Sequence, residues 1–473
     1  MPAGFEAELR GYQLEGLRWL EFLATAGIGG VLADDMGLGK TVQVLAHVWA
    51  RRLADPAGLP SLVVCPTSVL LNWREQSERF VPRMRLLALR GADRESLYAR
   101  IADSDLVLTS YSLLARDRES LARHAFDLAV FDEAQAIKNA KAKTAQAARD
   151  IDARRKLAVT GTPLENHLGE LWAQFDLVLP GLLGNERAFA RYYRTPIEKH
   201  GDDAQQARLN RRIAPFILRR TKAEVAKELP PKTEIVQRVE LEGRQRELYE
   251  TLRLAMHERV RDAVAARGLA QSGIVVIDAL LKLRQVCCDP RLVKLERAAE
   301  IEHSAKLDAL LEMLEPLIAD GRRILLFSQF TSMLDLIEQH LLERHWRYVR
   351  LDGATVDREA PINRFSRGDI PLFLLSLKAG GTGLNLTTAD TVIHYDPWWN
   401  PAAETQATDR AHRIGQDKPV FVYKLICAGT VEERIHALQQ RKSDLARAVL
   451  DGGTSGSLDF AQEDLDALFA PLG

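Results

Sequence analysis

A glycine-rich segment near the start of the chain has the residue types of a phosphate-binding loop. Asp34 to Thr41 read DDMGLGKT, after an apolar stretch typical of a strand and before an amphipathic stretch typical of a helix. In that context backbone N–H groups at a helix N-terminus bind phosphates, a lysine reaches the β- and γ-phosphates, and a hydroxyl holds Mg²⁺. Lys40 and Thr41 supply the last two groups, and Gly37 and Gly39 let the backbone approach closely. Because Asp34 stands where a first glycine is usual, a plain glycine-rich turn with a surface lysine is the alternative interpretation.

Two carboxylates directly follow an apolar run later in the same half of the chain. The run is Ala129–Phe131, and the carboxylates are Asp132 and Glu133. A carboxylate at the C-terminal end of a parallel strand can face the magnesium ion of a phosphate-binding loop. We expect Asp132 to hold the metal, directly or through water, and Glu133 to orient and deprotonate the attacking water. The alternative is a solvated acidic strand end.

Two arginines near the end of the chain have the spacing of a phosphate clamp. Arg410 and Arg413 lie three positions apart, so on a helix they would share a face. Two guanidinium groups that point the same way can neutralise a γ-phosphate in its transition state, the role of arginine fingers. The alternative is a pair of solvent-facing arginines. The first interpretation predicts that ATP lies between two α/β units and is hydrolysed when the second unit closes.

The elements that would position these groups are predicted from short apolar stretches that alternate with helix-like stretches. This alternation is typical of βα units and a parallel sheet. Strands are predicted at Gly30–Ala33, Leu62–Cys65, Leu106–Thr109, Leu128–Phe131, Lys156–Thr160, Ile324–Phe327, Tyr348–Leu351, Phe373–Ser376, Val392–Tyr395 and Val420–Leu425. Helices between strands are predicted at Val42–Leu53 and Lys141–Arg149.

The same rhythm predicts the domain organisation. Two α/β lobes, at 1–181 and 303–440, flank a mostly helical and charge-rich insertion and linker at 182–302. The order of the phosphate loop, the strands after it and Asp132 is that of a RecA-like sheet, so we expect RecA-like lobes. The segment 441–473 is predicted to be a linker and acidic tail with a short helix near Gln462–Phe469.

The bulk composition excludes several classes of protein. The 473 residues include 64 Lys and Arg and 65 Asp and Glu, so the net charge of −1 excludes a uniformly basic nucleic-acid coat. Four cysteines without a CxxC pair support neither a disulfide framework nor a zinc site, and they fit a reducing cytosol. We find no apolar run of 18 residues and no signal-peptide pattern, so we expect a cytoplasmic location and no membrane partner.

The motifs together resemble those of superfamily-two helicase-type ATPases of the Swi/Snf branch, the group of chromatin remodellers and DNA translocases. The likeness extends from Leu9 to about Glu433. Besides the segments above, it rests on LRGYQLEG from Leu9, CPTS from Cys65 with Asn72 and Trp73, DEAQ from Asp132, TGTPLEN from Thr160, FSQF from Phe327, KAGGTGLNL from Lys378, YDPWWNP from Tyr395 and QATDRAHRIGQ from Gln406. Phe216–Lys222 and Leu229–Lys232 resemble the helical insertion of this branch, and Gln135 stands where many members carry His.

The resemblance implies a DNA-dependent ATPase that uses ATP and Mg²⁺ and moves along double-stranded DNA, with protein cargo on that DNA as a further partner. We take a monomer as the default state, and we expect it to associate with the nucleoid if the chain is bacterial. A separate hypothesis is that the chain is cut from a longer protein. Gln13 would contact adenine, Thr160 and Thr162 would link the nucleotide to lobe movement, and Gln406 would lie near the γ-phosphate. The expected nucleotide-binding residues are Gln13, Asp35, Met36, Gly37, Leu38, Gly39, Lys40, Thr41, Arg410 and Arg413.

Polar residues that follow the predicted strands are candidates for contacts with the DNA backbone. Hydroxyls and amides at such positions suit phosphate contacts, which position a protein without reading sequence. The candidates are Thr67, Ser68, Ser110, Tyr111, Ser328, Gln329 and Lys378, and for each the alternative is an N-cap or a Ser/Thr turn. A basic cluster of Arg211, Arg212, Arg219, Arg220 and Lys222 would either bind a phosphate backbone or form a solvated face.

Two other functions remain open at this point. One is a helicase that separates strands, and the other is a nucleotide-gated scaffold that binds nucleic acid without turnover.

Overall fold

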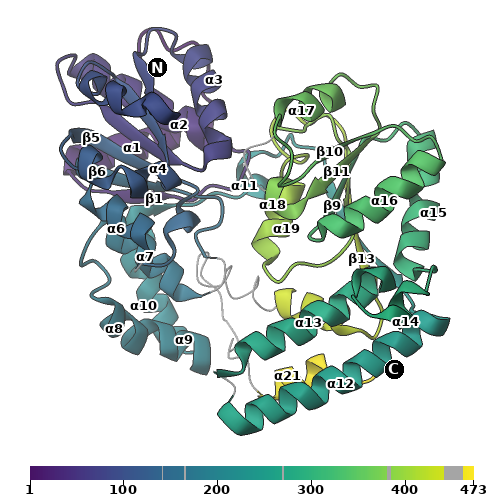
Figure 1. Ribbon diagram of the computed structural model, residues 1–473. Helices are drawn as coiled ribbons and strands as arrows, with labels where there is room; N and C mark the ends of the chain where they lie inside the picture. The colour runs from purple at the N-terminus through teal and green to yellow at the C-terminus, as the bar shows by residue number, and fades with distance from the viewer. Residues whose placement is uncertain (141, 165–166, 269–270, 381–384, 441–461, 473) are drawn as a thin grey trace. The chain divides into compact units, whose positions relative to one another are not determined.

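A computed structural model describes residues 1–140, 142–164, 167–268, 271–380, 385–440 and 462–472 (Figure 1). The chain forms two compact units, of which the first comprises Met1–Glu228 and the second begins at Leu229. Each unit contains one parallel sheet with helices packed against it. No helix in the described part of the chain combines the length and the apolar character needed to cross a membrane.

The first unit is built on a seven-stranded parallel sheet. Its strand order is β3-β4-β2-β5-β6-β1-β7. These strands are β1 (Gly30–Leu32), β2 (Ser61–Cys65), β3 (Leu86–Ala88), β4 (Leu106–Ser110), β5 (Ala125–Asp132), β6 (Asp152–Val159) and β7 (Ile217–Leu218). Because all pairs are parallel, the loops that follow β1, β5, β6 and β7 lie along one edge of the sheet.

The first unit also contains eleven labelled helices. They are α1 (Gly11–Ala26), α2 (Lys40–Ala54), α3 (Leu70–Phe80), α4 (Tyr111–Arg116), α5 (Arg118–Leu121), α6 (Lys143–Asp150), α7 (Leu168–Val178), α8 (Glu186–Phe189), α9 (Thr195–His200), α10 (Asp203–Ile213) and α11 (Lys222–Val225), all within the described residues. One apolar core joins α2 and α3 to the sheet through buried side chains such as Val44, Trp73 and Val130. The strands β2 and β4 are buried along their whole length, and burial on both faces explains why they are mostly apolar.

The second unit is built on a six-stranded parallel sheet of order β10-β11-β9-β12-β13-β8. Its strands are β8 (Lys232–Val239), β9 (Ile324–Ser328), β10 (Tyr348–Leu351), β11 (Leu372–Ser376), β12 (Thr391–His394) and β13 (Val420–Cys427). Its labelled helices are α12 (Gly243–Arg267), α13 (Gly273–Cys288), α14 (Glu296–Ala299), α15 (Ala305–Ala319), α16 (Thr331–Glu343), α17 (Glu359–Ser366), α18 (Leu377–Gly380), α19 (Pro401–Thr408) and α21 (Gln462–Leu468).

Strand β9 shows how the second sheet buries both faces. Ile324 and Leu326 belong to the core under α15 and α16, whereas Leu325 and Phe327 belong to the core on the opposite face. Successive side chains of a strand point to opposite faces, so a continuous apolar run is what a doubly covered strand requires.

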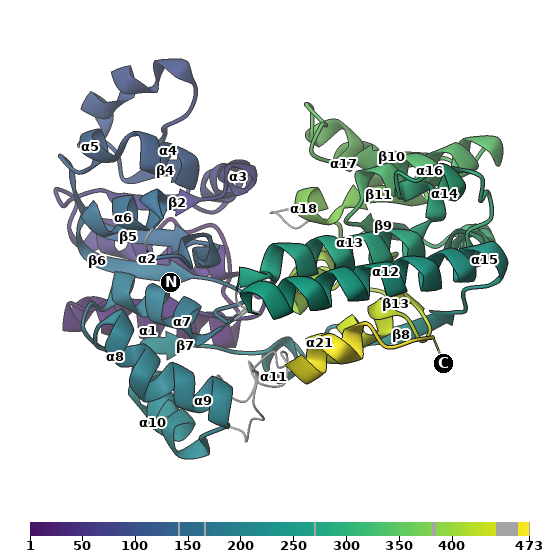
Figure 2. The same ribbon diagram turned by 60° about the horizontal axis from the view of Figure 1, so that its bottom comes forward.

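The long helices α12 and α13 form a helical pair, and α21 lies alongside α12 (Figure 2). Their shared core contains residues from all three helices, among them Tyr249, Leu283 and Leu465. The carbonyl of Phe469 accepts a hydrogen bond of 2.7 Å from Arg253 Nη1 of α12. The C-terminal segment that contains α21 is therefore packed against α12 and α13 and hydrogen-bonded to α12.

The structure confirms the predicted strands of both α/β parts to within a few residues and confirms the helix near the C-terminus. The predictions missed three strands, β3, β7 and β8. Strand β7 has only two residues, and β8 is an edge strand whose exposed, charged residues resemble a helical surface. The segment 182–302 is mainly helical, is divided between the two units and supplies an edge strand to each sheet.

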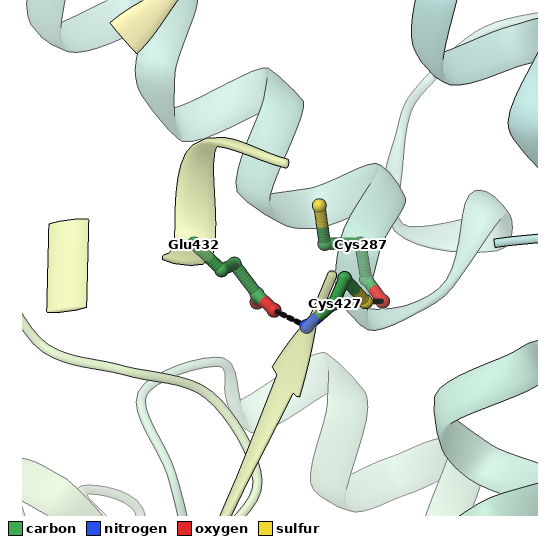
Figure 3. Close-up of side chains that lie close together, drawn as sticks. All are labelled: Cys287, Cys427 and Glu432. Atoms are coloured by element: carbon green, nitrogen blue, oxygen red, sulfur yellow. Dashed lines mark hydrogen bonds between the residues drawn. The ribbon is translucent and has the colours of Figure 1, made fainter. Parts of the chain in front are cut away.

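A buried ion pair joins α15 to the segment that follows β13. Lys306 Nζ donates to Glu432 Oε2, both side chains are fully buried, and the Cys427 amide donates to the same oxygen at 3.0 Å. Cys287 joins Cys427 and Glu432 in a group whose potential metal-ligand atoms lie within 4.8 Å of one another (Figure 3). Burial raises the pKa of the Cys287 thiol well above its ordinary value. Because Lys306 already neutralises Glu432, we interpret this group as structural.

We expect Lys306→Met to lower the free energy of unfolding by about 3–5 kcal/mol, because it leaves a buried carboxylate without its counter-charge. The double variant Lys306→Met/Glu432→Gln should recover most of that loss. The control is Lys282→Met, which breaks a partly exposed pair with Asp278 and should cost about 0–1 kcal/mol. Urea unfolding followed by circular dichroism measures all three, and equal losses for the two single variants would contradict the expectation.

Candidate nucleotide site

The loop between β1 and α2 has the backbone geometry of a phosphate cradle. Gly37 and Gly39 adopt positive φ angles of 85° and 80°, which side-chain-bearing residues rarely adopt. Helix α2 begins at Lys40 after Gly39, and no side chain caps its N-terminus. Uncapped N–H groups at a helix N-terminus favour a phosphate. The described loop therefore fits the predicted phosphate site.

The amine of Lys40 points into this loop. Its Nζ donates to the carbonyl oxygens of Asp34 at 2.7 Å and Asp35 at 3.3 Å. A Cβ atom placed on Gly161, after β6, would lie 2.5 Å from Met36 Cγ and 3.6 Å from Lys40 Nζ. The loop after β6 is therefore pressed against the phosphate loop, and only glycine permits that approach.

Asp132 at the end of β5 is the buried carboxylate of the site. Burial, followed by the charge of Glu133, raises the pKa of Asp132 to about 6. Trp73 Nε1 donates to its Oδ2 at 2.7 Å, and the Glu133 amide donates to its Oδ1 at 2.9 Å. These bonds and the positive charge of Lys40 act in the opposite direction on that pKa. A carboxylate held by neutral donors and raised in pKa is one that a divalent cation would stabilise, so Asp132 fits the predicted Mg²⁺ ligand, and the role of Thr41 as a second ligand stays a prediction.

A chain of hydrogen bonds joins the end of β5 to the end of β6. Gln135 Nε2 donates to Glu133 Oε2 at 2.7 Å, and Thr160 Oγ1 donates to Gln135 Oε1 at 2.9 Å. The Thr162 amide donates to Thr160 Oγ1 at 3.0 Å. Glu133 itself adopts φ 51°, an uncommon conformation for a residue with a side chain. The orientation of Glu133 thus depends on the loop that contains Thr160 and Thr162.

The predicted adenine-contact residue packs against the phosphate loop. Gln13 Nε2 donates to the Leu38 carbonyl at 3.1 Å, and the Tyr12 hydroxyl donates to the same carbonyl at 2.9 Å. The amide of Arg10 donates to Gln13 Oε1 at 2.9 Å. Gln13 therefore belongs to the site, and its contact with adenine stays a prediction.

The predicted basic cluster does not form a single surface. Arg220 is buried and forms an ion pair with Asp34, with Nε–Oδ1 at 2.9 Å and Nη2–Oδ2 at 2.5 Å. The backbone amide of Lys222 donates to Asp35 Oδ2 at 2.9 Å. Arg211 and Arg212 are exposed on α10. Arg220 therefore lies on neither a phosphate-binding face nor a solvated face. It is the counter-charge of Asp34, the first residue of the phosphate loop.

The two predicted arginine fingers lie in a turn rather than on a helix. Helix α19 ends at Thr408, and the carbonyl of Arg410 accepts from the Leu386 amide at 3.1 Å. Arg410 is buried, Arg413 is half-buried, and burial lowers the pKa of Arg413 while Asp409 acts in the opposite direction. The helical spacing argument for a shared face is thus wrong, although both arginines directly follow α19.

Gln406, predicted near the γ-phosphate, is half-buried on α19 itself. It lies in the same unit as the two arginines, whereas Lys40, Asp132 and Glu133 lie in the first unit.

The candidate DNA-contact residues of the first unit divide into two groups. Thr67 is exposed and Ser68 half-exposed in the turn after β2. Ser110 caps α4, since its hydroxyl accepts from the Leu113 amide at 3.4 Å. Tyr111 is buried, and its hydroxyl donates to the Asp132 carbonyl at 2.8 Å. Thr67 and Ser68 remain candidates, whereas Ser110 matches the N-cap alternative and Tyr111 is bonded to the backbone of Asp132.

The candidates of the second unit are also partly engaged within the protein. Ser328 is buried and donates to Asp396 Oδ1 at 2.6 Å, and the amide of Gln329 donates to the same oxygen at 3.2 Å. The backbone of Lys378 lies in α18, but its side chain is outside the described residues, as is the segment 381–384 of the same predicted motif.

Comparison with known proteins identifies the family. The SNF2-related domain matches residues 12–292, and the helicase conserved C-terminal domain matches residues 305–415. The chain belongs to the SNF2-related family. The two parallel-sheet lobes and the predicted Swi/Snf resemblance are thereby confirmed.

Several named proteins share this SNF2-related core. An uncharacterized ATP-dependent helicase of Mycoplasma pneumoniae is 39% identical, over 98% of this chain and 44% of that protein. YwqA of Bacillus subtilis, provisionally named an ATP-dependent helicase/translocase, is 38% identical over 98% of this chain and 51% of that protein. The ISWI chromatin-remodeling complex ATPase ISW1 of Saccharomyces cerevisiae is 34% identical over 95% and 41%. The chain spans about half the length of the curated relatives it matches.

Among solved structures, a SWI2/SNF2 ATPase core of Sulfolobus solfataricus in complex with dsDNA matches with 35% identity and a TM-score of 0.49. That match covers 99% of this chain and 98% of the other.

Proposed function

We propose that this SNF2-family chain hydrolyses ATP to ADP and phosphate and uses the energy to move along double-stranded DNA. The observation that carries the proposal is the assembly of Lys40, Asp132 and Glu133 at one edge of the first sheet, linked to the loop of Thr160. These are the groups that phosphoryl transfer needs for positioning and charge stabilisation. The intact set argues against a scaffold without turnover.

In this proposal each group has one task. The N-terminus of α2 and Lys40 bind the phosphates, Thr41 and Asp132 hold Mg²⁺, and Glu133 accepts a proton from the attacking water. Mg²⁺ supplies charge neutralisation at the β- and γ-phosphates when it is bound. Arg410 and Arg413 neutralise charge on the γ-phosphate, which requires the two units to close around one nucleotide. Turnover would then be coupled to movement of the units.

Support for DNA as the track comes from the family. ISW1 is named a chromatin-remodeling ATPase and YwqA a helicase/translocase, and chromatin contains double-stranded DNA. Thr67 and Ser68 follow β2 on the surface, where short hydroxyls suit phosphate contacts. Protein cargo on DNA, a monomeric state and a cytoplasmic location belong to the same proposal. The names of the bacterial relatives also favour strand separation as the second candidate.

The central experiment measures phosphate release with and without duplex DNA at low salt. We expect DNA to stimulate release by the wild-type chain and Lys40→Ala to abolish it, because the variant lacks the charge that binds the β- and γ-phosphates. Displacement of a third strand from a triplex, without unwinding of a fork, would support the translocase. Unwinding without triplex displacement would support the helicase, and the absence of any stimulation by DNA would contradict both.

Arg413→Ala should retain ATP binding and reduce turnover by roughly 10³–10⁵-fold, the usual cost of removing an arginine finger. The matched control is Arg364→Ala, an exposed arginine on α17 that should leave turnover unchanged. Fluorescent-nucleotide binding and steady-state phosphate release measure the two quantities separately. Normal hydrolysis by Arg413→Ala would show that the site does not use this arginine.

Thr160→Val keeps the shape of the side chain but removes the donor to Gln135 and the acceptor for the Thr162 amide. We expect the KM for ATP to stay near the wild-type value, because Lys40 and α2 are intact, and kcat to fall roughly tenfold as Glu133 loses its orientation. The control is Thr25→Val on the exposed face of α1, where the hydroxyl bonds only to its own helix. An unchanged kcat would mean that the hydrogen-bond chain does not position Glu133.

A further inference from the structure

The first residue of the phosphate loop carries a negative charge in a place where phosphates are expected to bind. Asp34 is separated from the end of β1 by Ala33 alone, and its side chain is fully buried. A buried carboxylate repels a nearby triphosphate unless a cation neutralises it, because screening by solvent is weak there. The charge of Asp34 therefore needs a fixed partner for the loop to accept an anion.

Arg220 is that partner, although it lies 186 positions further along the chain. Its guanidinium binds the carboxylate through two N–H groups, at 2.9 Å and 2.5 Å, in the bidentate geometry that arginine favours. Gln43 Nε2 of α2 adds a third hydrogen bond to the same carboxylate at 3.2 Å. Asp34 is thus neutralised and held in one orientation.

The same guanidinium also fixes the N-terminal end of α1. Arg220 Nη1 donates to the Tyr12 carbonyl, Nη2 donates to Gln43 Oε1 at 2.9 Å, and the group lies 5.2 Å from the Tyr12 ring centroid. The Tyr12 hydroxyl in turn holds the Leu38 carbonyl at 2.9 Å. Arg220 therefore acts directly on the start of the phosphate loop and, through Tyr12, on its end.

A glycine and the backbone show that the chain is shaped around this arginine. A Cβ atom on Gly16 of α1 would lie 1.9 Å from Gln43 Oε1 and 2.9 Å from Arg220 Nη2. The Ala33 amide donates to the Leu218 carbonyl at 2.7 Å, and the Asp35 amide donates to the Arg220 carbonyl at 3.0 Å. The segment that carries Arg220 is hydrogen-bonded along β1 and into the loop itself.

We propose that Arg220 is a positioning residue of the nucleotide site, which neutralises Asp34 and sets the phosphate loop to accept a nucleoside triphosphate. This inference rests on the proposed use of ATP and goes beyond it by assigning a role to a residue outside the loop. It predicts that the charge of the arginine matters for nucleotide affinity, in addition to any contribution to folding.

The test compares ATP affinity and kcat in four proteins, the wild type, Arg220→Met, Asp34→Asn and the double variant Asp34→Asn/Arg220→Met. We expect Arg220→Met to weaken ATP binding by roughly 10–100-fold, as is typical when a group that orients primary ligands is removed. Asp34→Asn should weaken binding less than Arg220→Met does, because it removes the negative charge and keeps one oxygen acceptor for Arg220. The double variant should regain most of the affinity, because no unpaired carboxylate remains.

The control variant is Arg123→Met, an exposed arginine of the same unit, and urea unfolding checks that each protein is folded. If Arg220→Met does not fold, the double variant and Asp34→Asn still test the charge argument. Wild-type affinity in folded Arg220→Met, a double variant no better than the single one, or Asp34→Asn as weak as Arg220→Met would each overturn the inference. A wild-type chain that binds no ATP in this assay would instead refute the proposed function.

Discussion

Parallel pairing brings the carboxyl ends of neighbouring strands to one edge of a sheet, and the whole nucleotide site depends on that constraint. Strands β1, β5 and β6 deliver Lys40, Asp132 and Thr160 to the same edge of the first sheet. The two-residue strand β7 does the same for Arg220, because it pairs with β1 in parallel. Strand β7 is too short to bury much apolar surface. Its position beside β1 nevertheless places Arg220 where the guanidinium neutralises Asp34. The chain enters the second unit soon after, at Leu229.

The two buried carboxylates at this edge, Asp34 and Asp132, differ in the charge of the groups that donate hydrogen bonds to them. That difference indicates their roles. Asp34 is paired with the guanidinium of Arg220, so it has no need of another cation. Asp132 accepts from the indole of Trp73 and from a backbone amide, both neutral donors, and its pKa remains raised to about 6. A divalent cation would relieve the cost of burying Asp132 and would gain nothing from Asp34. The acidic residue that replaces the usual first glycine is therefore structural, whereas the one after β5 suits the metal.

How much of this could be read from the sequence depends on the range of the interaction. The phosphate loop, the strand before Asp132 and most core strands were predictable because local spacing and apolar runs encode them. The edge strand β8 was not, since its exposed polar residues lack an apolar period. The Asp34–Arg220 pair joins positions 186 apart, and the Trp73–Asp132 bond joins positions 59 apart. A single sequence does not show which distant residues pair with each other. It shows only two unusual residues, an acid in a phosphate loop and an arginine beside an apolar segment.

Gln135 shows how one substitution relative to many family members acts physically. Its amide donates to Glu133 through Nε2 and accepts from Thr160 through Oε1, so it links the two loops with a fixed direction. A neutral histidine can also donate with one nitrogen and accept with the other, but a protonated histidine can only donate and would lose the bond from Thr160. Histidine titrates between about pH 5 and 8, whereas an amide does not. The residue that joins the ends of β5 and β6 in this chain therefore carries no titratable group of its own, whereas a histidine at position 135 would change its hydrogen bonding within the neutral range.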